Sequence, residues 1–271
     1  MTGSLDAAQR AQFDAKGYVT GLAALNAAEL ADAKAGVMAL YGELDEGLYK
    51  HFINLHAVLD WADRLGRHPA ILDAVESLLG PHLFLWKSKA FVKFPGPGHV
   101  PWHQDVPHWN LAPEEAITAW VGLSDVHEGN GCVRVVPGTQ KQGSRAAAAS
   151  ADASSLLSAG IQFAVTEAEA ASAEPMLLKA GQFSLHHGMV VHASGANDTD
   201  APRIGIALSY IGARTKQRSA PDMHVNLVRG IDSEGFFPPS APPAGPRAAQ
   251  MAAAAVYFGK LKSGEIPYNV R

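Results

Sequence analysis

The spacing of apolar residues changes about a third of the way along the chain. Before residue 83 they recur every three or four positions, which predicts helices. Asn26 and Glu29 have the spacing of a capping box and mark the start of one helix. A second helix is predicted over residues 68–80, with Gly80 as its stop signal. The apolar series of the first helix is Leu30, Ala33, Val37, Met38 and Tyr41.

After residue 83, apolar and polar residues alternate in short runs separated by turn residues, which predicts β-strands. The runs are too short and too closely spaced for βαβ units. Strands that follow a group of helices predict an α+β fold with a β-sandwich or barrel core. The predicted strands cover residues 83–94, 116–126, 132–138, 175–181, 182–191 and 203–213.

Three further segments differ in composition from the predicted core of residues 83–213. Residues 144–174 are rich in Ala, Ser and Glu and are interpreted as an insertion with some helix, over or beside the core. Residues 236–246 form a Pro-rich connector, and the Ala-rich residues 247–262 are predicted to be a final surface helix. Residues 144–174 and 216–240 are candidate lids. We expect residues 1–271 to form a single domain.

Composition narrows the possible classes of protein. The chain is 47% apolar and 18% charged, so it can build a sizeable core. Its formal net charge of −4, without a dense basic block, argues against nucleic acid as the main partner. The one cysteine, Cys132, excludes an internal disulfide and a cysteine-rich zinc site. No run predicts a membrane span or a signal peptide, so the expected location is cytoplasmic.

The stretch WHQDVPHWN, residues 102–110, indicates a metal site. On a strand, His103 and Asp105 would point to the same face and could bind one ion. A third ligand is then needed from a distant strand, and SLHHGMVVHASGAND offers His186, His187 and His192. Two histidines and one carboxylate on one face of an ion form the facial triad of non-haem Fe(II) oxygenases, which leaves three positions open.

Those open positions need an occupant, commonly 2-oxoglutarate together with dioxygen (O2). The far carboxylate of 2-oxoglutarate requires a buried cation with forked geometry, which arginine supplies. Arg203 lies eleven residues after His192. If the two residues lie on adjacent strands, Arg203 comes close to the metal, and Ser194 could donate to the same carboxylate.

The combination of HQD, AWVGLSDVHEGNGCVRVVPGT and HHGMVVHASGANDTDAPRIGIALSY resembles the phytanoyl-CoA dioxygenase-like family of Fe(II)/2-oxoglutarate oxygenases. The resemblance covers residues 83–213. It implies a double-stranded β-helix, a jelly-roll core, with helices packed on one side. It also implies Fe(II), 2-oxoglutarate and O2 as metal, cosubstrate and oxidant.

The resemblance also implies roles for particular residues. It assigns the distal metal ligand to His192, and it implies that Arg203 and Ser194 contact the distal carboxylate of 2-oxoglutarate. Lys87 stands where a relative has a Gln that contacts 2-oxoglutarate. Trp120 resembles a cofactor-side aromatic, and Trp109 matches an aromatic that lines the substrate pocket.

Asp105 bears on the type of reaction. Related halogenases replace this carboxylate with a small residue, so its presence favours hydroxylation of a small-molecule substrate, with release of succinate and carbon dioxide. The same iron centre could instead desaturate, epoxidise or cleave a bond from carbon to a heteroatom. A non-catalytic binding module on the same fold is the alternative outside enzymes. The sequence predicts neither the substrate nor the oligomeric state.

The sequence leaves alternative roles open for other polar residues near the motifs. If residues 182–191 form a strand, at most one of His186 and His187 faces the cavity, where it could support the metal site. His108 lines the substrate pocket or lies on its rim. The lysines of KSKAFVK share one strand face, which is either solvated or lines a polar cavity, and in the second case Lys89 could meet an anionic group of the substrate.

Overall fold

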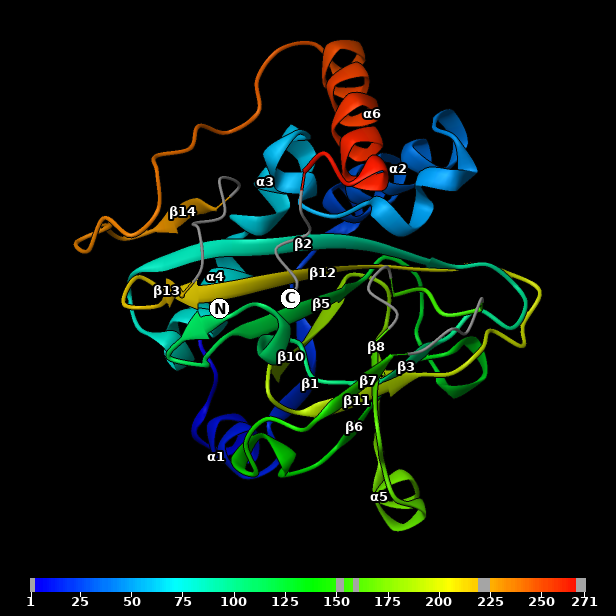
Figure 1. Ribbon diagram of the computed structural model, residues 1–271, viewed down its shortest axis with the longest axis vertical. Helices are drawn as coiled ribbons and strands as arrows, with labels where there is room; N and C mark the ends of the chain where they lie inside the picture. The colour runs from blue at the N-terminus through cyan, green and yellow to red at the C-terminus, as the bar shows by residue number, and fades with distance from the viewer. Residues whose placement is uncertain (1–2, 150–153, 158–160, 219–224, 267–271) are drawn as a thin grey trace.

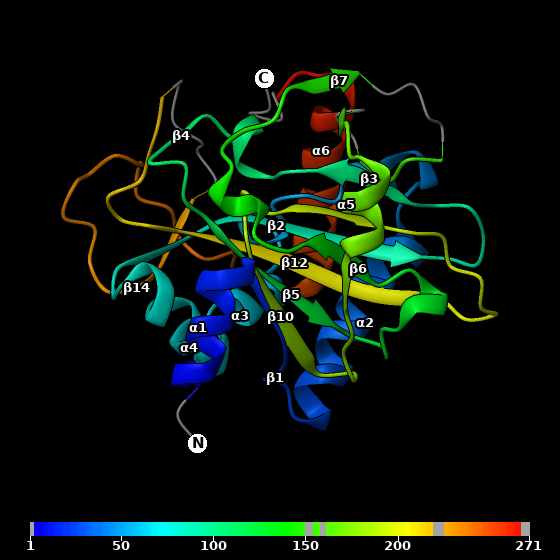
Figure 2. The same cartoon turned by 90° about the horizontal axis from the view of Figure 1, so that it is seen from below.

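Two antiparallel β-sheets form a double-stranded β-helix in the computed structural model (Figures 1 and 2). The structure describes residues 3–149, 154–157, 161–218 and 225–266. The larger sheet has the strand order β1-β10-β5-β12-β2-β14, and the smaller has the order β3-β11-β6-β9. This arrangement confirms the predicted jelly-roll core within an α+β fold.

The six strands of the larger sheet come from distant parts of the chain. The central strand β12 pairs with β5 on one side and with β2 on the other. The strand bounds are β1 Tyr18–Ala23, β2 Leu83–Lys93, β5 Ile117–Gly122, β10 Gln182–His187, β12 Arg203–Gly212 and β14 Asn226–Arg229.

The smaller sheet and the short pairs complete the β-structure. The strands of the smaller sheet are β3 Val100–His103, β6 Val133–Val136, β9 Glu174–Met176 and β11 Val191–Ser194. Two separate pairs are formed by β4 Leu111–Ala112 with β13 Lys216–Gln217, and by β7 Ala147–Ala149 with β8 Ile161–Phe163. The pair β7–β8 and the short helix α5 Glu167–Ser172 lie in the predicted insertion.

Helices cover the outer face of the larger sheet. Figure 1 shows α2, α3 and α6 on the same side of β2. Side chains from these helices and from α4 form one hydrophobic cluster with the sheet, so the helices bury the apolar side of the strands. The α-helices are α1 Ala7–Lys16, α2 Ala27–Glu43, α3 Asp60–Gly66, α4 Pro69–Leu79 and α6 Arg247–Ser263. The 3₁₀ turns are η1 Glu46–His51, η2 Leu55–Ala57, η3 Val106–His108, η4 Glu128–Asn130 and η5 Thr139–Lys141.

Local signals set the helix ends as the sequence predicts. Asn26 accepts hydrogen bonds from the backbone N–H groups of Ala28 and Glu29, and the Glu29 side chain accepts one from the Asn26 N–H. Helix α4 ends at Leu79, and Gly80 follows with a positive φ of 86°. No helix among the described residues is both long and apolar enough to span a bilayer.

Two predictions about the strands are wrong. The segment 182–191 is not one strand, because β10 ends at His187 and β11 starts at Val191 after a turn. The N–H of Gly188, in that turn, donates to the carbonyl of Ala116. Strands β11 and β12 are also not adjacent, since they belong to different sheets. The loop that connects them therefore crosses from one sheet to the other.

Candidate active site

The two outer histidines of the predicted triad face each other across neighbouring strands. His103 ends β3, and His192 lies opposite it in the register of β11, with ring centroids 4.0 Å apart. The Nδ1 of each ring lies within hydrogen-bond distance of a backbone carbonyl, at 2.9 Å from Pro101 and 3.0 Å from Val190. When Nδ1 carries the proton, these contacts fix both rings and leave each Nε2 lone pair for a metal.

Asp105 reaches the two rings from just beyond the strand. Its backbone is helical rather than extended, with φ −76° and ψ −54° at the start of η3, so the predicted same-strand geometry is wrong. Its N–H donates to the carbonyl of Gly188 at 2.8 Å, which ties this segment to the turn before β11. The Oδ1 atom lies 3.5 Å from His103 Nε2 and 3.9 Å from His192 Nε2.

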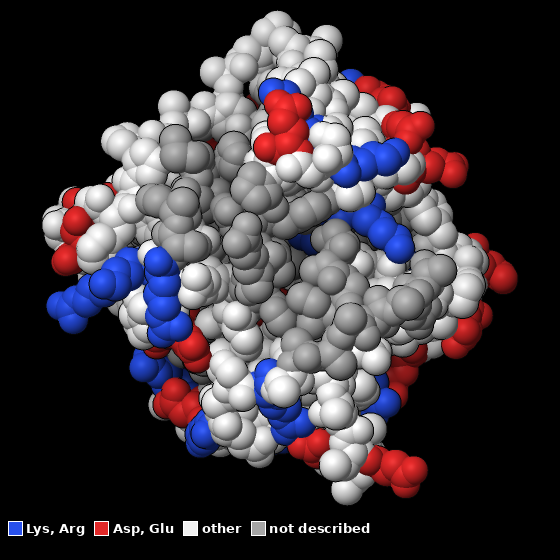
Figure 3. Space-filling model, viewed as in Figure 1, with Lys and Arg blue, Asp and Glu red and all other residues white. Residues whose placement is uncertain are grey.

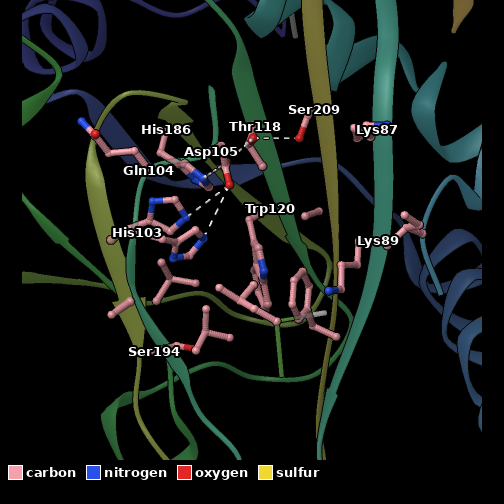
Figure 4. A pocket seen from close by; sticks show the side chains of 18 of the residues that line it. Lys87, Lys89, His103, Gln104, Asp105, Thr118, Trp120, His186, Ser194 and Ser209 are labelled. Atoms are coloured by element: carbon pink, nitrogen blue, oxygen red, sulfur yellow. Dashed lines mark hydrogen bonds and ion pairs between the residues drawn. The ribbon is translucent and has the colours of Figure 1, made fainter. Parts of the chain in front are cut away.

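The second carboxylate oxygen of Asp105 faces other groups. Thr118 donates its hydroxyl to Oδ2 at 3.2 Å, and the Nε2 of His186 lies 3.6 Å from the same atom (Figure 4). Thr118 also lies 2.9 Å from the Ser209 hydroxyl. The carboxylate is thus divided, with Oδ1 toward the histidine pair and Oδ2 held from the opposite sheet. Thr118 and Ser209 were not predicted as site residues, although the alternation in their strands places them on the polar face.

The local environment sets the protonation states of the triad. Burial and the neighbouring His103 lower the pKa of His192 well below its usual value, so its imidazole is neutral at pH 7. Burial alone would raise the pKa of Asp105, but the surrounding imidazoles, His192 first, outweigh it and hold that pKa well below its usual value. A neutral imidazole and an ionised carboxylate are the forms that bind metal ions.

The geometry fits one divalent cation. One ligand atom from each of His103, Asp105 and His192 can be chosen so that all three lie within 4.8 Å of one another. All three residues come from one side of the cavity, which leaves the other side of an ion open. Two imidazoles and one carboxylate with open positions are typical of non-haem Fe(II) sites.

Arg203 is a buried cation with unused hydrogen-bonding capacity. Its Nη2 donates to the carbonyl of Gly131 at 3.1 Å, whereas its Nε and Nη1 have no partner among the described residues. Burial lowers the pKa of this guanidinium to about 10, so it remains charged at pH 7. A buried, partly unsatisfied guanidinium that lines the cavity fits a carboxylate ligand.

A tryptophan holds this guanidinium in place. The Arg203 guanidinium carbon lies 4.8 Å from the centroid of a Trp120 ring, within the range of a cation–π contact. The same indole lies across Gly205, where a Cβ atom would come within 2.2 Å of it. Glycine is therefore required at position 205 for Trp120 to lie beside Arg203.

Lys93 is a second buried cation at the Arg203 end of the sheet. The two residues are partners in the register of β2 and β12. The Lys93 ammonium donates to the backbone carbonyls of Ser194 and Gly195. Burial, followed by repulsion from Arg203, lowers the pKa of Lys93 to about 7. These bonds hold the end of β11, whose residue Ser194 is buried and lines the cavity.

The remaining predicted residues surround one cavity. Lys87 and Lys89 enter it from β2, on the side opposite His103 (Figure 4). This location agrees with the alternative in which the lysine face lines a polar cavity. Trp109 is buried and also lines the cavity. The side chain of His108 lies outside the described part of the structure.

The two histidines at the end of β10 point in opposite directions. His186 lines the cavity, whereas His187 lies 6.4 Å from the ring of Phe13 on α1, measured between centroids. The Nδ1 of His187 accepts a hydrogen bond from the N–H of Met189 at 3.0 Å. His127 is exposed, and Cys132, the one cysteine, is buried.

Comparisons with known proteins indicate the family and the fold. Residues 13–205 match the phytanoyl-CoA dioxygenase (PhyH) family. The solved structure of the non-heme monooxygenase ThoJ, in its apo form, superposes with a TM-score of 0.75 at 33% identity, and the alignment covers 94% of this chain and 97% of that one.

Two curated relatives match over shorter regions. A probable alpha-ketoglutarate-dependent hypophosphite dioxygenase from Stutzerimonas stutzeri is 28% identical, over 61% of this chain and 58% of its own length. An L-proline trans-4-hydroxylase from Streptomyces griseoviridis is 33% identical, over 33% of this chain and 36% of its own length. The chain thus spans less than two thirds of either relative. Because the family match covers well over half of the 271 residues, the chain belongs to the phytanoyl-CoA dioxygenase family.

Proposed function

We propose that this protein is an Fe(II)- and 2-oxoglutarate-dependent dioxygenase that hydroxylates a small molecule. The observation that carries the proposal is the presence, in one cavity, of the His103–Asp105–His192 triad and the partly unsatisfied guanidinium of Arg203. The names of the relatives support it, since one is alpha-ketoglutarate-dependent and another is a hydroxylase. We also propose that residues 1–271 form one oxygenase domain.

In this proposal the two ends of the cavity have separate tasks. The His103 and His192 Nε2 atoms and Asp105 Oδ1 hold Fe(II). At the other end, Arg203 and Ser194 bind the distal carboxylate of 2-oxoglutarate, and Trp120 keeps the guanidinium in place. Lys87 is assigned to 2-oxoglutarate as well, on the resemblance to the family.

Iron and 2-oxoglutarate, when bound, supply the oxidation: O2 and 2-oxoglutarate give succinate, carbon dioxide and one oxygen atom for the substrate. The protein positions the substrate beside the metal and excludes water. Burial of Trp109 and Trp120 supports a pocket with little solvent. Because Asp105 occupies the carboxylate position, hydroxylation is favoured over halogenation.

The substrate side of the cavity is assigned to Trp109, Lys89 and His108. The relatives' names include hypophosphite and L-proline, and this chain is proposed to act on a small molecule too. Desaturation, epoxidation or cleavage of a bond from carbon to a heteroatom would use the same residues. Product analysis by mass spectrometry separates these outcomes from hydroxylation.

The first test is anaerobic assembly of the site. Metal-free protein receives Fe(II) and 2-oxoglutarate, and the visible charge-transfer band of the chelated iron is recorded. We expect a band in the wild type, none in His192→Ala, and in Arg203→Ala a band that needs about 100-fold more 2-oxoglutarate, because a charged hydrogen-bond partner is lost. The matched control is His127→Ala, which removes an exposed histidine and leaves the band unchanged.

The same preparations distinguish the enzyme from a binding module. With O2, the wild type releases succinate and His192→Ala does not. A folded, iron-loaded wild-type protein that shows no band would contradict the assignment of the triad or of 2-oxoglutarate. The non-catalytic binding module on the same fold would then be the better description.

A further inference from the structure

Among the residues that the structure describes, Lys89 is a cation in the cavity without a charged partner. Its side chain lines the cavity from the middle of β2. Its ammonium donates to the carbonyl of Leu156 at 3.4 Å and lies 4.9 Å from the centroid of the Phe91 ring. Neither contact neutralises the charge, and Lys89 forms no ion pair within the described ranges of the chain.

The Lys89 side chain is largely withdrawn from water, although not fully buried, which makes this lone charge unfavourable. Desolvation lowers the pKa of Lys89 to about 8, and the attraction of Asp105 offsets only part of this effect. Lys50, on η1, adds repulsion from outside the cavity. A buried ammonium is normally paired with an anion or bonded to several acceptors, because leaving its water is costly. Among the described residues, no carboxylate lies close enough to Lys89 to pair with it, and Asp105 acts on it only from a distance.

A count of charge over the cavity leads to the same conclusion. Within the described residues, the charged side chains that line it are Lys87, Lys89, Asp105 and Arg203. The two positive charges of Fe(II) and the two negative charges of 2-oxoglutarate cancel, and Asp105 and Arg203 cancel. Two positive charges then remain, on Lys87 and Lys89. Lys87 lies 5.0 Å from the centroid of the Trp86 ring and is assigned above to 2-oxoglutarate. Lys89 is thus the cation of this pair that has no assigned partner once metal and cosubstrate are in place.

The position of Lys89 separates it from the distal carboxylate of 2-oxoglutarate. Lys89 is in register with Ala207, whereas Arg203 is in register with Lys93. Four residues of strand correspond to about 13 Å, so the two cations mark different parts of the cavity. Figure 4 shows Lys89 across the cavity from His103 and Asp105.

We infer that the substrate is an anion whose carboxylate, phosphonate or phosphate group pairs with Lys89. This inference rests on the proposed function and adds the class of substrate to it. The ion pair would fix one end of the substrate on β2 and direct another part of it across the cavity toward the triad. Neutral molecules of the same shape would leave the Lys89 ammonium without an anionic partner and would bind more weakly.

The test measures anion binding to the complex with Fe(II) and 2-oxoglutarate, kept anaerobic. Acetate, methylphosphonate and inorganic phosphate are titrated with tryptophan fluorescence as the readout, because Trp109 and Trp120 line the cavity. Acetamide is the neutral match for acetate. We expect at least one anion to bind the wild type, and Lys89→Met to weaken its binding about tenfold or more, as for loss of a charged hydrogen-bond partner.

Three further variants sharpen the result. Lys89→Arg keeps the charge and should retain binding, whereas Lys89→Glu should lose it entirely. The control Lys179→Met removes a lysine whose side chain is 81% exposed and should behave as the wild type. The affinity for 2-oxoglutarate, read from the visible band, should stay the same in Lys89→Met, since the cosubstrate is held at the other end.

The inference is overturned if Lys89→Met binds all three anions as tightly as the wild type, or if the wild type binds acetamide as tightly as acetate. A large loss of 2-oxoglutarate affinity in Lys89→Met would also overturn it, because Lys89 would then serve the cosubstrate. None of these outcomes removes the visible band from the wild type, whereas failure of the proposed function does. The two failures can therefore be told apart.

Discussion

The two faces of the larger sheet differ in what their side chains contact. On β12, Ile204, Ile206 and Leu208 point outward into the hydrophobic cluster beneath the helices. The residues between them point inward, and Arg203, Ala207 and Ser209 line the cavity. Strand β5 repeats the pattern, with Ala119 and Val121 outward and Thr118 and Trp120 inward. The same alternation thus separates a face that stabilises the fold from a face that builds the site.

The packing that stabilises the site lies on the outward face of the sheet and not among the site residues. The outward face buries apolar area continuously, which is the main favourable term in folding. Among the described residues, the inward face holds buried polar atoms without hydrogen-bond partners, including two nitrogens of Arg203 and the Nδ1 of His186. Such groups cost free energy in the absence of a ligand. Substitutions on the two faces should therefore affect different measurements.

The largest stability effect is expected from Leu208→Ala on the outward face. Leu208 is fully buried in the cluster, so its truncation should lower the free energy of unfolding by about 2–5 kcal/mol. The neighbouring change Ser209→Ala, on the inward face, removes one hydroxyl contact with Thr118 and should cost about 1 kcal/mol. Urea unfolding of both variants, followed by circular dichroism, measures the difference.

The effects of these two variants on iron affinity should be in the opposite order. Below the unfolding transition, folded Leu208→Ala should keep its affinity for iron, whereas Ser209→Ala disturbs the Thr118 hydroxyl that holds Asp105. The distinction between the faces breaks down if Ser209→Ala is the less stable of the two, or if folded Leu208→Ala binds iron more weakly than Ser209→Ala.

A smaller effect is expected from the groups that hold the second oxygen of Asp105. Thr118→Val and His186→Gln each remove or alter one contact to Oδ2 and leave all three ligands in place. Outer contacts of this kind typically change metal affinity by about 10–100-fold. We expect weaker Fe(II) binding in both variants and a shifted visible band, because the carboxylate can turn and offer both oxygens to the metal.

Competition with a coloured chelator measures the iron affinity of these variants. His187→Gln is the matched control, since it alters the adjacent histidine that points away from the cavity. Equal iron affinity and an unshifted band in His186→Gln would mean that Asp105 is held by its backbone and Thr118 alone.

Periodicity was enough to predict most elements of this fold but not the break within residues 182–191. The letters QFSLHHGMVV alternate only in part, and nothing in them separates one long strand from two short ones. The break depends on contacts from elsewhere, because Gly188 packs so closely on Val106 that a Cβ would lie 2.4 Å from it. The carbonyl of Gly188 then accepts the N–H groups of Asp105 and Val106.

The site was predictable where residue type and family resemblance limit the choices, as for His103, Asp105, His192 and Arg203. The path of the loop that brings Arg203 into the cavity was not predictable. A loop of the same length can join neighbouring strands or cross between opposite sheets. Surface charge did not indicate the site. Figure 3, which has the same view as Figure 1, shows basic and acidic side chains interspersed around the edge of the molecule. Thr118 could be recognised only once the register placed it beside Asp105.

The adjacent histidines of β10 give the most selective test of the two faces, because its effect is confined to one pH range. Burial, with a lesser contribution from His186, lowers the pKa of His187 to about 4. Between pH 6.5 and 4 the unfolded chain binds a proton at this histidine that the native protein does not. The contribution of His187 therefore lowers the free energy of unfolding as the pH decreases through this window. Above pH 6.5 His187 has no such effect, and below pH 4 it causes no further loss.

His187→Gln, which can still accept the N–H of Met189, should flatten the decline by about 1–3 kcal/mol, somewhat less than the full shift because the ring is partly exposed. Urea unfolding at pH 7 and pH 4.5 measures the change, with His127→Gln as the control on an exposed histidine. If His187→Gln and the wild type decline in parallel, His187 takes up its proton in the native state, and its packing against α1 is looser than the structure indicates.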